Sequence, residues 1–217
     1  MPAKQSTIDA AEKAKNYLII RTATVRGLEG LNWYEDARTE LAALCESEGF
    51  DYLNFILVMA ATSPRVKVWM NVRHTIRIMR SLKANNGNAA VAVAAVPGIM
   101  KDMRKATIKA LNAGDTSTLG PKSACFAENL LGNEYMVTLD VWMARLVGLE
   151  GDDASSVTTK MVSKPYMATV RQVAANLGYS PAQVQAACWT YISKKLGNAT
   201  DGEGDFKAII SKALATA

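Results

Sequence analysis

Residues 118–124 have the sequence Thr-Leu-Gly-Pro-Lys-Ser-Ala and separate two stretches of helical composition. A glycine followed by proline predicts a short turn that ends where a new helix begins, because proline suits the first turn of a helix. Backbone N–H groups and the helix dipole make such a helix start attractive to an anion such as phosphate. The pattern therefore predicts a phosphate-contacting turn at Thr118, Leu119 and Gly120, followed by a helix whose first turn carries Lys122.

A carboxylate is expected close to Lys122. Asp140 follows Lys122 by 18 residues (140 − 122) and directly precedes an apolar run, where it would cap the next helix. The helix from residue 121 carries the chain about 15 Å away, and residues 132–139 can return it over as much as roughly 26 Å. We expect the amine and the carboxylate to meet in one cleft, where a partly buried lysine can act as a nucleophile. A surface lysine and a simple capping aspartate are the alternative interpretation.

Helical periodicity dominates the rest of the chain. Only residues 91–96 show a short strand-like alternation. An all-α fold is therefore predicted. The expected helices are 6–21, 34–47, 50–61, 64–83, 99–112, 121–131, 140–149, 165–177, 181–195 and 205–214.

The predicted helix 64–83 is strongly basic. Ser63 is the expected N-cap, and an apolar stripe lies apart from a ridge of three arginines. The ridge consists of Arg73, Arg77 and Arg80. Because the segment contains no acidic residue, we expect the ridge to contact phosphates, with a solvated charged face as the alternative. His74 lies beside the ridge and is expected to be exposed.

Composition limits the class of protein. The 217 residues carry a net charge of +5, which favours a polyanionic partner. No apolar run is long enough to span a membrane and the N-terminus lacks the apolar core of a signal peptide, so we expect a cytoplasmic protein without a membrane partner. Three scattered cysteines and one histidine match no familiar zinc or iron–sulfur spacing, so no metal and no cofactor are expected.

The segment around Lys122 resembles the helix-hairpin-helix DNA glycosylase superfamily, in particular its endonuclease-III-like members. There a hairpin Leu-Pro-Gly-Val-Gly-x-Lys-Thr-Ala precedes a Val-Asp-Thr-His segment. Here residues 119–124 and 137–140 occupy the corresponding places, so Lys122 matches the Schiff-base lysine and Asp140 the catalytic aspartate. Upstream, residues 61–64 are similar to the family's Leu-Ser-Ala-Gln segment. The likeness covers about residues 50–148.

Several positions depart from the family pattern. Thr118 replaces the first glycine of the hairpin, Pro64 replaces the glutamine, and Trp142 replaces the histidine after the aspartate. The cluster cysteines are absent. A group of phage proteins with this fold is also similar, through their Ser-Pro, Gly-Pro-Lys and Gly-Tyr-Ser-Pro motifs, which suggests a viral origin and the host cytoplasm.

The resemblance implies a two-lobed helix-hairpin-helix glycosylase-like fold without an iron–sulfur cluster. One lobe would comprise residues 49–139 and the other residues 1–48 with 140–217. The implied function is a monomeric DNA glycosylase with AP (β-)lyase activity, acting through a Schiff base on a flipped nucleotide. Trp142, Asn71 and Ser63 are the expected pocket residues. A phage enzyme that processes a hypermodified base and a non-catalytic DNA-binding protein are the alternatives.

Overall fold

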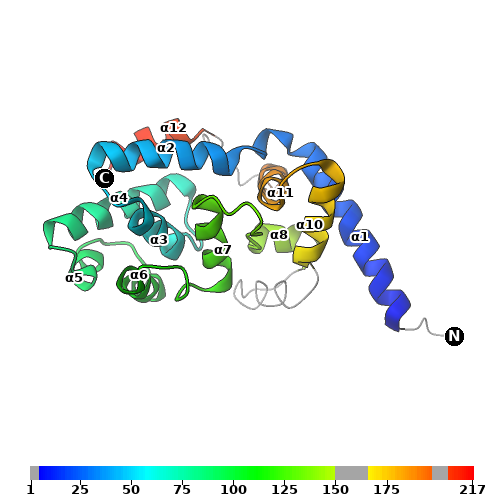
Figure 1. Cartoon of the computed structure of the whole chain (residues 1–217), viewed down its shortest axis with the longest axis horizontal. Helices are drawn as coiled ribbons and strands as arrows, with labels where there is room; N and C mark the ends of the chain where they lie inside the picture. Colours follow the sequence, from blue (N-terminus) through cyan, green and yellow to red (C-terminus); the bar gives the residue numbers. More distant parts are fainter. Residues whose placement is uncertain (1–4, 150–165, 197–204) are drawn as a thin grey trace. The chain divides into compact units, whose positions relative to one another are not determined.

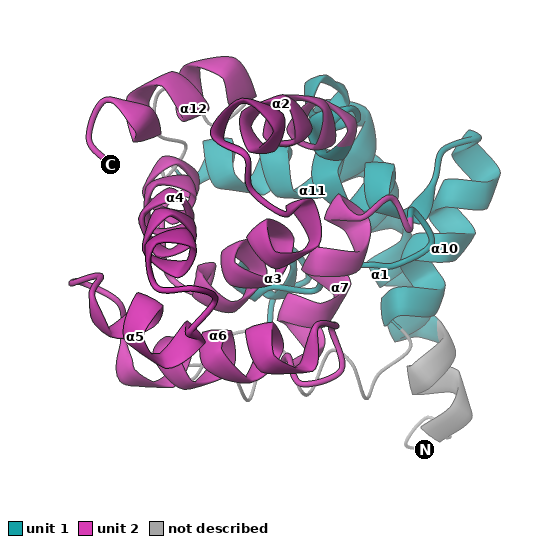
Figure 2. Cartoon of the chain, turned by 60° about the vertical axis from the view of Figure 1, so that its left-hand side comes forward, with its two compact units in different colours: residues 1–34, 134–199 teal, residues 35–133, 200–217 magenta. Residues whose placement is uncertain are grey.

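A computed structural model of the chain describes residues 5–149, 166–196 and 205–217, and within these ranges every regular element is a helix (Figure 1). The all-α prediction is therefore confirmed. The chain forms two compact units (Figure 2). Unit 1 comprises residues 1–34 and 134–199, and unit 2 comprises residues 35–133 and 200–217.

Unit 2 is built around a buried helix. Its helices are most of α2 (Trp33–Glu48), then α3 (Tyr52–Thr62), α4 (Val68–Ala84), α5 (Ala89–Ala94), α6 (Lys101–Ala113), α7 (Pro121–Leu130) and α12 (Phe206–Leu214). All residues of α3 from Phe55 to Thr62 are buried, and this helix packs against α4, α6 and α7. Asp51 caps α3 by accepting a hydrogen bond from the Asn54 N–H. An almost wholly apolar helix is thus surrounded by amphipathic ones.

Unit 1 is centred on α11. Its elements are α1 (Gln5–Arg26), the 3-10 helix η1 (Leu28–Gly30), α8 (Val141–Leu146), α10 (Tyr166–Leu177) and α11 (Pro181–Lys195). A capping box of Ser180 and Gln183 starts α11. Close packing of η1 on α11 depends on Gly27, because a Cβ atom there would lie 2.0 Å from the carbonyl oxygen of Ala187.

Two local predictions are wrong. Ser63 does not begin α4 but caps the C-terminal end of α3, and the N-cap of α4 is Lys67. The break follows from Arg65, whose φ of 60° lies in the left-handed region and interrupts the helix. The alternating residues 91–96 form no strand, because Asn88 caps the helix α5 by accepting a hydrogen bond from the Val91 N–H.

The C-terminal helix α12 packs on α4 within unit 2. The Lys212 amine lies 4.6 Å from the centroid of the Trp69 ring, and the Arg73 Nε donates to the Thr216 carbonyl oxygen at 2.7 Å. The lobes predicted from the sequence follow a different division, in which residues 205–214 belong with residues 1–48.

Candidate functional site

The helix–turn–helix around Lys122 forms as the sequence predicts. Helix α6 ends at Gly114, whose φ of 72° suits the left-handed C-cap. The chain then turns and begins α7 with Gly120 as N-cap and Pro121 in the first helical position. Lys122 is therefore the second residue of α7, at the positive end of its dipole.

The side chain of Lys122 is half-buried and held from two helices. Its Nζ donates a hydrogen bond to the Ser63 Oγ at 2.8 Å, and it lies 4.9 Å from the centroid of the Phe126 ring. The Ser63 hydroxyl in turn donates to the Ala60 carbonyl oxygen at 3.0 Å. The structure thus brings Lys122 and the predicted pocket residue Ser63 into direct contact.

Asp140 caps helix α8 in unit 1. Its Oδ1 accepts hydrogen bonds from the backbone N–H groups of Trp142 and Met143, both at 3.0 Å, so the predicted capping role is confirmed. The Arg145 guanidinium lies 4.7 Å from the centroid of the Trp142 ring. Lys122 belongs to unit 2 and Asp140 to unit 1. Their meeting in one cleft remains a prediction.

In the turn before α7, the groups that could contact a phosphate belong more to the backbone than to side chains. Leu119 is 8% exposed, so its side chain packs inward, whereas Thr118 and Gly120 are exposed. A Cβ atom on Gly120 would meet nothing within 4 Å, so this glycine is not required by packing. The exposed Asp115 carboxylate lies in the same turn, and hydrogen bonds from Ser117 lower its pKa. This negative charge opposes phosphate binding.

The arginine ridge of α4 is largely committed within unit 2. The Arg80 guanidinium forms a two-pronged ion pair with Glu48 at 2.8 and 3.0 Å, and this hydrogen bonding lowers the pKa of Glu48. Arg73 donates to the Thr216 carbonyl, and Arg77 is half-buried. The predicted lack of an acidic partner is wrong for Arg80, because helix α2 supplies one.

Two further α4 residues differ from expectation. His74 is buried, with an exposed fraction of 6%, whereas an exposed side chain is expected from the sequence. Burial, followed by the charges of Arg73 and Arg77, lowers its pKa. Asn71 is buried: its amide donates to the Met59 carbonyl at 3.0 Å and accepts from the Thr62 hydroxyl at 2.7 Å. Asn71 therefore joins α4 to α3, and its amide is not available to line an open pocket.

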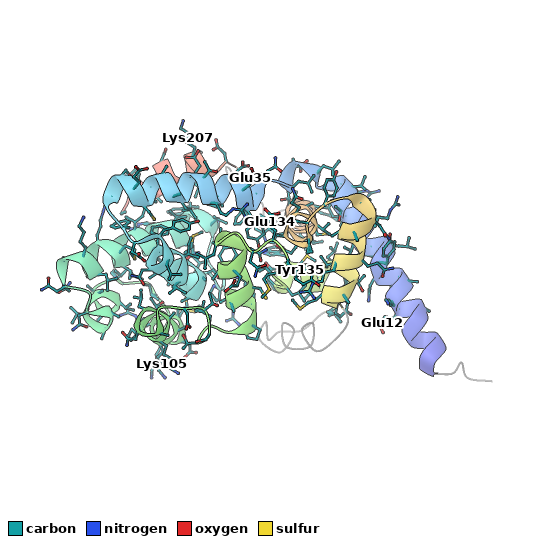
Figure 3. The ribbon with its side chains drawn as sticks, viewed as in Figure 1. Glu12, Glu35, Lys105, Glu134, Tyr135 and Lys207 are labelled. Carbon is teal, nitrogen blue, oxygen red and sulfur yellow. The ribbon has the colours of Figure 1, made fainter. Side chains whose placement is uncertain are left out.

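Helix α6 carries an exposed basic face that lies outside the predicted DNA-binding residues of the turn and of α4. We define this face as Lys101, Lys105 and Lys109, which are exposed, recur every fourth residue and so share one side of the helix. None of them forms an ion pair with another residue in the described ranges. Figure 3 shows Lys105 pointing away from the ribbon. The repeat of lysines opposite buried Met103, Thr107 and Ala110 is the signal that could have identified it.

Arg104 on the same helix has a different role. Its guanidinium donates to the carbonyl oxygens of Val93, Ala94, Val96 and Ile99 at 2.9 to 3.4 Å. These carbonyls lie at and just after the C-terminal end of α5, where a cation is favoured by the unsatisfied acceptors. Arg104 is therefore a capping residue and is separate from the exposed basic face.

Unit 1 contains a cavity of about 780 Å³ beside α8. Helices α1, α8 and α11 line it mainly with aliphatic side chains, and Arg145, Tyr191 and Lys195 add polar groups. A hydrogen bond from Arg26 lowers the pKa of the Tyr191 hydroxyl. None of the predicted pocket residues lines this cavity. Three segments distant in the chain form it, so no local pattern indicates it.

Other kinds of site find little support in the described residues. They contain no group of three or more potential metal-ligating His, Cys, Asp or Glu side chains. In the same ranges, the helices fall short of the length and apolar character that crossing a membrane requires. Burial raises the pKa of Cys45 and of Cys188 to about 12, so neither thiol is activated for nucleophilic chemistry.

Comparison with known proteins yields one family match. The model of a family of unknown function (DUF7178) matches residues 6–196. This range contains both Lys122 and Asp140 and ends ahead of α12. No curated protein and no solved structure matches the chain.

Proposed function

The chain belongs to the DUF7178 family, whose function is unknown, and we propose that it is a DNA glycosylase with AP (β-)lyase activity. The observation that supports this proposal is the environment of Lys122. Its amine is half-buried and held at the start of α7 by Ser63 and Phe126, whereas an ordinary surface lysine extends into water. A lysine fixed in this way is positioned to attack a substrate carbon once its amine has lost a proton.

The proposed reaction begins with the neutral Lys122 amine. Its nitrogen bonds to the sugar C1′ carbon while the C1′–N bond breaks, and the base departs with the bonding electrons and takes up a proton. Loss of a proton from the nitrogen and opening of the sugar ring give an imine. Removal of a C2′ proton then expels the 3′ phosphate, which cleaves the strand. The Asp140 carboxylate would stabilise the positive charge that develops on the sugar.

The exposed basic face of α6 supports DNA as the substrate. Three lysines on one helix face can each neutralise a phosphate, and they lie on the helix that leads into the turn before Lys122. We therefore place the main phosphate contacts on Lys101, Lys105 and Lys109. The arginine ridge of α4 becomes secondary, because Arg73 and Arg80 already have partners.

Borohydride trapping tests the proposal directly. The intact protein is incubated with duplexes containing an abasic site, uracil, or an oxidised purine or pyrimidine, and the imine is reduced to a stable adduct. We expect an adduct with at least one duplex, its loss in Lys122→Ala, and its persistence in Lys13→Ala, a change at an exposed lysine of α1. Absence of an adduct on every duplex, or an equal adduct in Lys122→Ala, would refute the proposed activity.

A non-catalytic DNA-binding protein is the second candidate, and the capping role of Asp140 favours it. A carboxylate that already accepts two backbone hydrogen bonds has a structural reason to be present. This candidate predicts salt-sensitive binding without turnover, retained in Lys122→Ala. Product formation from any of the same duplexes, including one with a hypermodified phage base, would exclude it.

A further inference from the structure

Ser63 lies where its hydroxyl group can fix the position of the Lys122 amine through a hydrogen bond. It is the C-cap residue of α3, and Pro64 and the left-handed Arg65 follow it, so its backbone position is closely defined. Its hydroxyl hydrogen is directed to the Ala60 carbonyl oxygen at 3.0 Å. The hydroxyl oxygen lies 2.8 Å from the Lys122 Nζ.

We infer that Ser63 is a positioning residue that fixes and holds the Lys122 amine until an electrophile arrives. Because a hydroxyl has one hydrogen and Ser63 donates it to Ala60, its oxygen can only accept from Lys122. This fixes the direction of the hydrogen bond. An ammonium group donates a stronger hydrogen bond to a hydroxyl oxygen than a neutral amine does. Ser63 therefore favours the protonated form of Lys122. The Phe126 ring, 4.9 Å away, acts in the same sense.

The same geometry argues against Ser63 as a nucleophile. A lysine beside a serine can in principle deprotonate the hydroxyl, which would make Ser63 the attacking group. However, Ser63 lies at the C-terminal end of α3, where the negative end of the helix dipole disfavours an alkoxide. Its hydrogen is also directed to Ala60 and not to Lys122.

A consequence concerns the order of events at the site. The amine must lose a proton before its lone pair can attack, and the neutral amine keeps two N–H bonds, one of which can still donate to Ser63. Ser63 therefore orients the Lys122 nitrogen in the resting protein and favours its protonated form, which cannot attack. This inference rests on the proposed function only in taking the amine as the attacking group.

Reductive methylation tests the inference without DNA. The intact protein is treated with formaldehyde and cyanoborohydride between pH 6 and 10, and modification of Lys122 is followed by mass spectrometry, with Lys105 as the exposed reference. Ser63→Ala should move the pH midpoint of Lys122 labelling down by about half a unit to one unit. Ser63→Thr, which keeps the hydroxyl, should restore the wild-type profile.

Ser47→Ala is the matched control. Ser47 lies near the end of α2 and donates to the carbonyl three residues back, at 2.9 Å, as Ser63 does to Ala60. The control should lower stability by a similar amount and leave the Lys122 profile unchanged. An unchanged midpoint in Ser63→Ala, or labelling of Ser63 by a fluorophosphonate, would overturn the inference.

The result separates this inference from the proposed function. A shifted midpoint in Ser63→Ala together with no trapped DNA adduct in the wild type would support the positioning role and refute the glycosylase. A trapped adduct with an unchanged midpoint would support the glycosylase and refute the positioning role.

Discussion

The start of α7 and the helix α4 both belong to unit 2, and both carry basic residues that sequence analysis assigns to DNA. On α4, Arg80 pairs with Glu48 and Arg73 with the Thr216 carbonyl, so unit 2 uses these charges for its own stability. At α7, Lys122 meets a hydroxyl and an aromatic ring, and these contacts orient its amine. The comparison shows that a basic sequence pattern identifies which helix carries the cationic side chains. The contacts that these side chains make within the protein decide which of them can bind a ligand.

The partners on α4 come from distant parts of the chain. Glu48 is 32 residues from Arg80, and Thr216 is 143 residues from Arg73. No window of sequence around α4 contains them. The four predictions below test whether α4 is structural while the DNA contacts lie on α6 and at the start of α7.

Asn71→Ala should have the largest effect. The substitution leaves the buried Met59 carbonyl without its side-chain donor and removes one of the two acceptors of the Thr62 hydroxyl, the other being the Val58 carbonyl. Stability should therefore fall by about 2–3 kcal/mol. Urea unfolding measures the loss. Asn85→Ala, which removes a half-buried hydrogen bond to the Ser81 carbonyl, should cost less. Equal losses would contradict a central structural role for Asn71.

Replacing the exposed basic face should weaken DNA binding. If Lys101, Lys105 and Lys109 each neutralise one phosphate, the triple Lys→Gln variant should reduce the slope of log affinity against log salt by about 2.7. Affinity near physiological salt should fall about tenfold or more. Fluorescence anisotropy at several salt concentrations gives both values. The matched control is Lys13→Gln with Lys15→Gln on α1, and an equal effect there would argue for unspecific attraction.

The buried imidazole of His74 should make the stability of the protein depend on pH. Its pKa is lowered in the folded protein by burial first and by Arg73 and Arg77 next, so below pH 6.5 the unfolded chain binds a proton that the folded chain resists. Stability should therefore fall as pH decreases from 7 towards 5.5. Since the chain has one histidine, its imidazole NMR signal reports the pKa directly. His74→Gln should remove the dependence, and a wild-type profile that is flat over this range would contradict it.

The Arg80–Glu48 pair should have the smallest effect. Both side chains are partly exposed, at 42% and 25%, so Glu48→Gln should cost less than about 1 kcal/mol after solvent screening. The pKa of Glu48 is lowered by Arg80, so the advantage of the wild type should be present above pH 4.5 and disappear as pH falls through the lowered pKa. Stability curves of both proteins between pH 3 and 6 measure it. If Glu48→Gln also raises DNA affinity, the pair competes with phosphate.

Local patterns predict most of the helices and their caps. Proline after glycine at residues 120–121, Asp140 before an apolar run and Ser180 with Gln183 are all capping signals, and each one starts a helix. These predictions succeed because a helix end has unsatisfied backbone groups that only nearby residues can satisfy. The prediction for Ser63 fails because its hydroxyl can cap either helix, and the left-handed backbone of Arg65 ends α3 there and delays the start of α4.

The sequence alone determined that the described part of the chain is all-helical, that Lys122 lies in the first turn of a helix after a turn, and that Asp140 caps another helix. Short-range hydrogen bonding and apolar periodicity carry this information. Only the tertiary structure decided that His74 and Asn71 are buried, that Glu48 forms an ion pair with Arg80, and that Ser63 accepts a hydrogen bond from the Lys122 amine. The physical reason is that burial and pairing depend on which distant segments pack together, which no local pattern encodes.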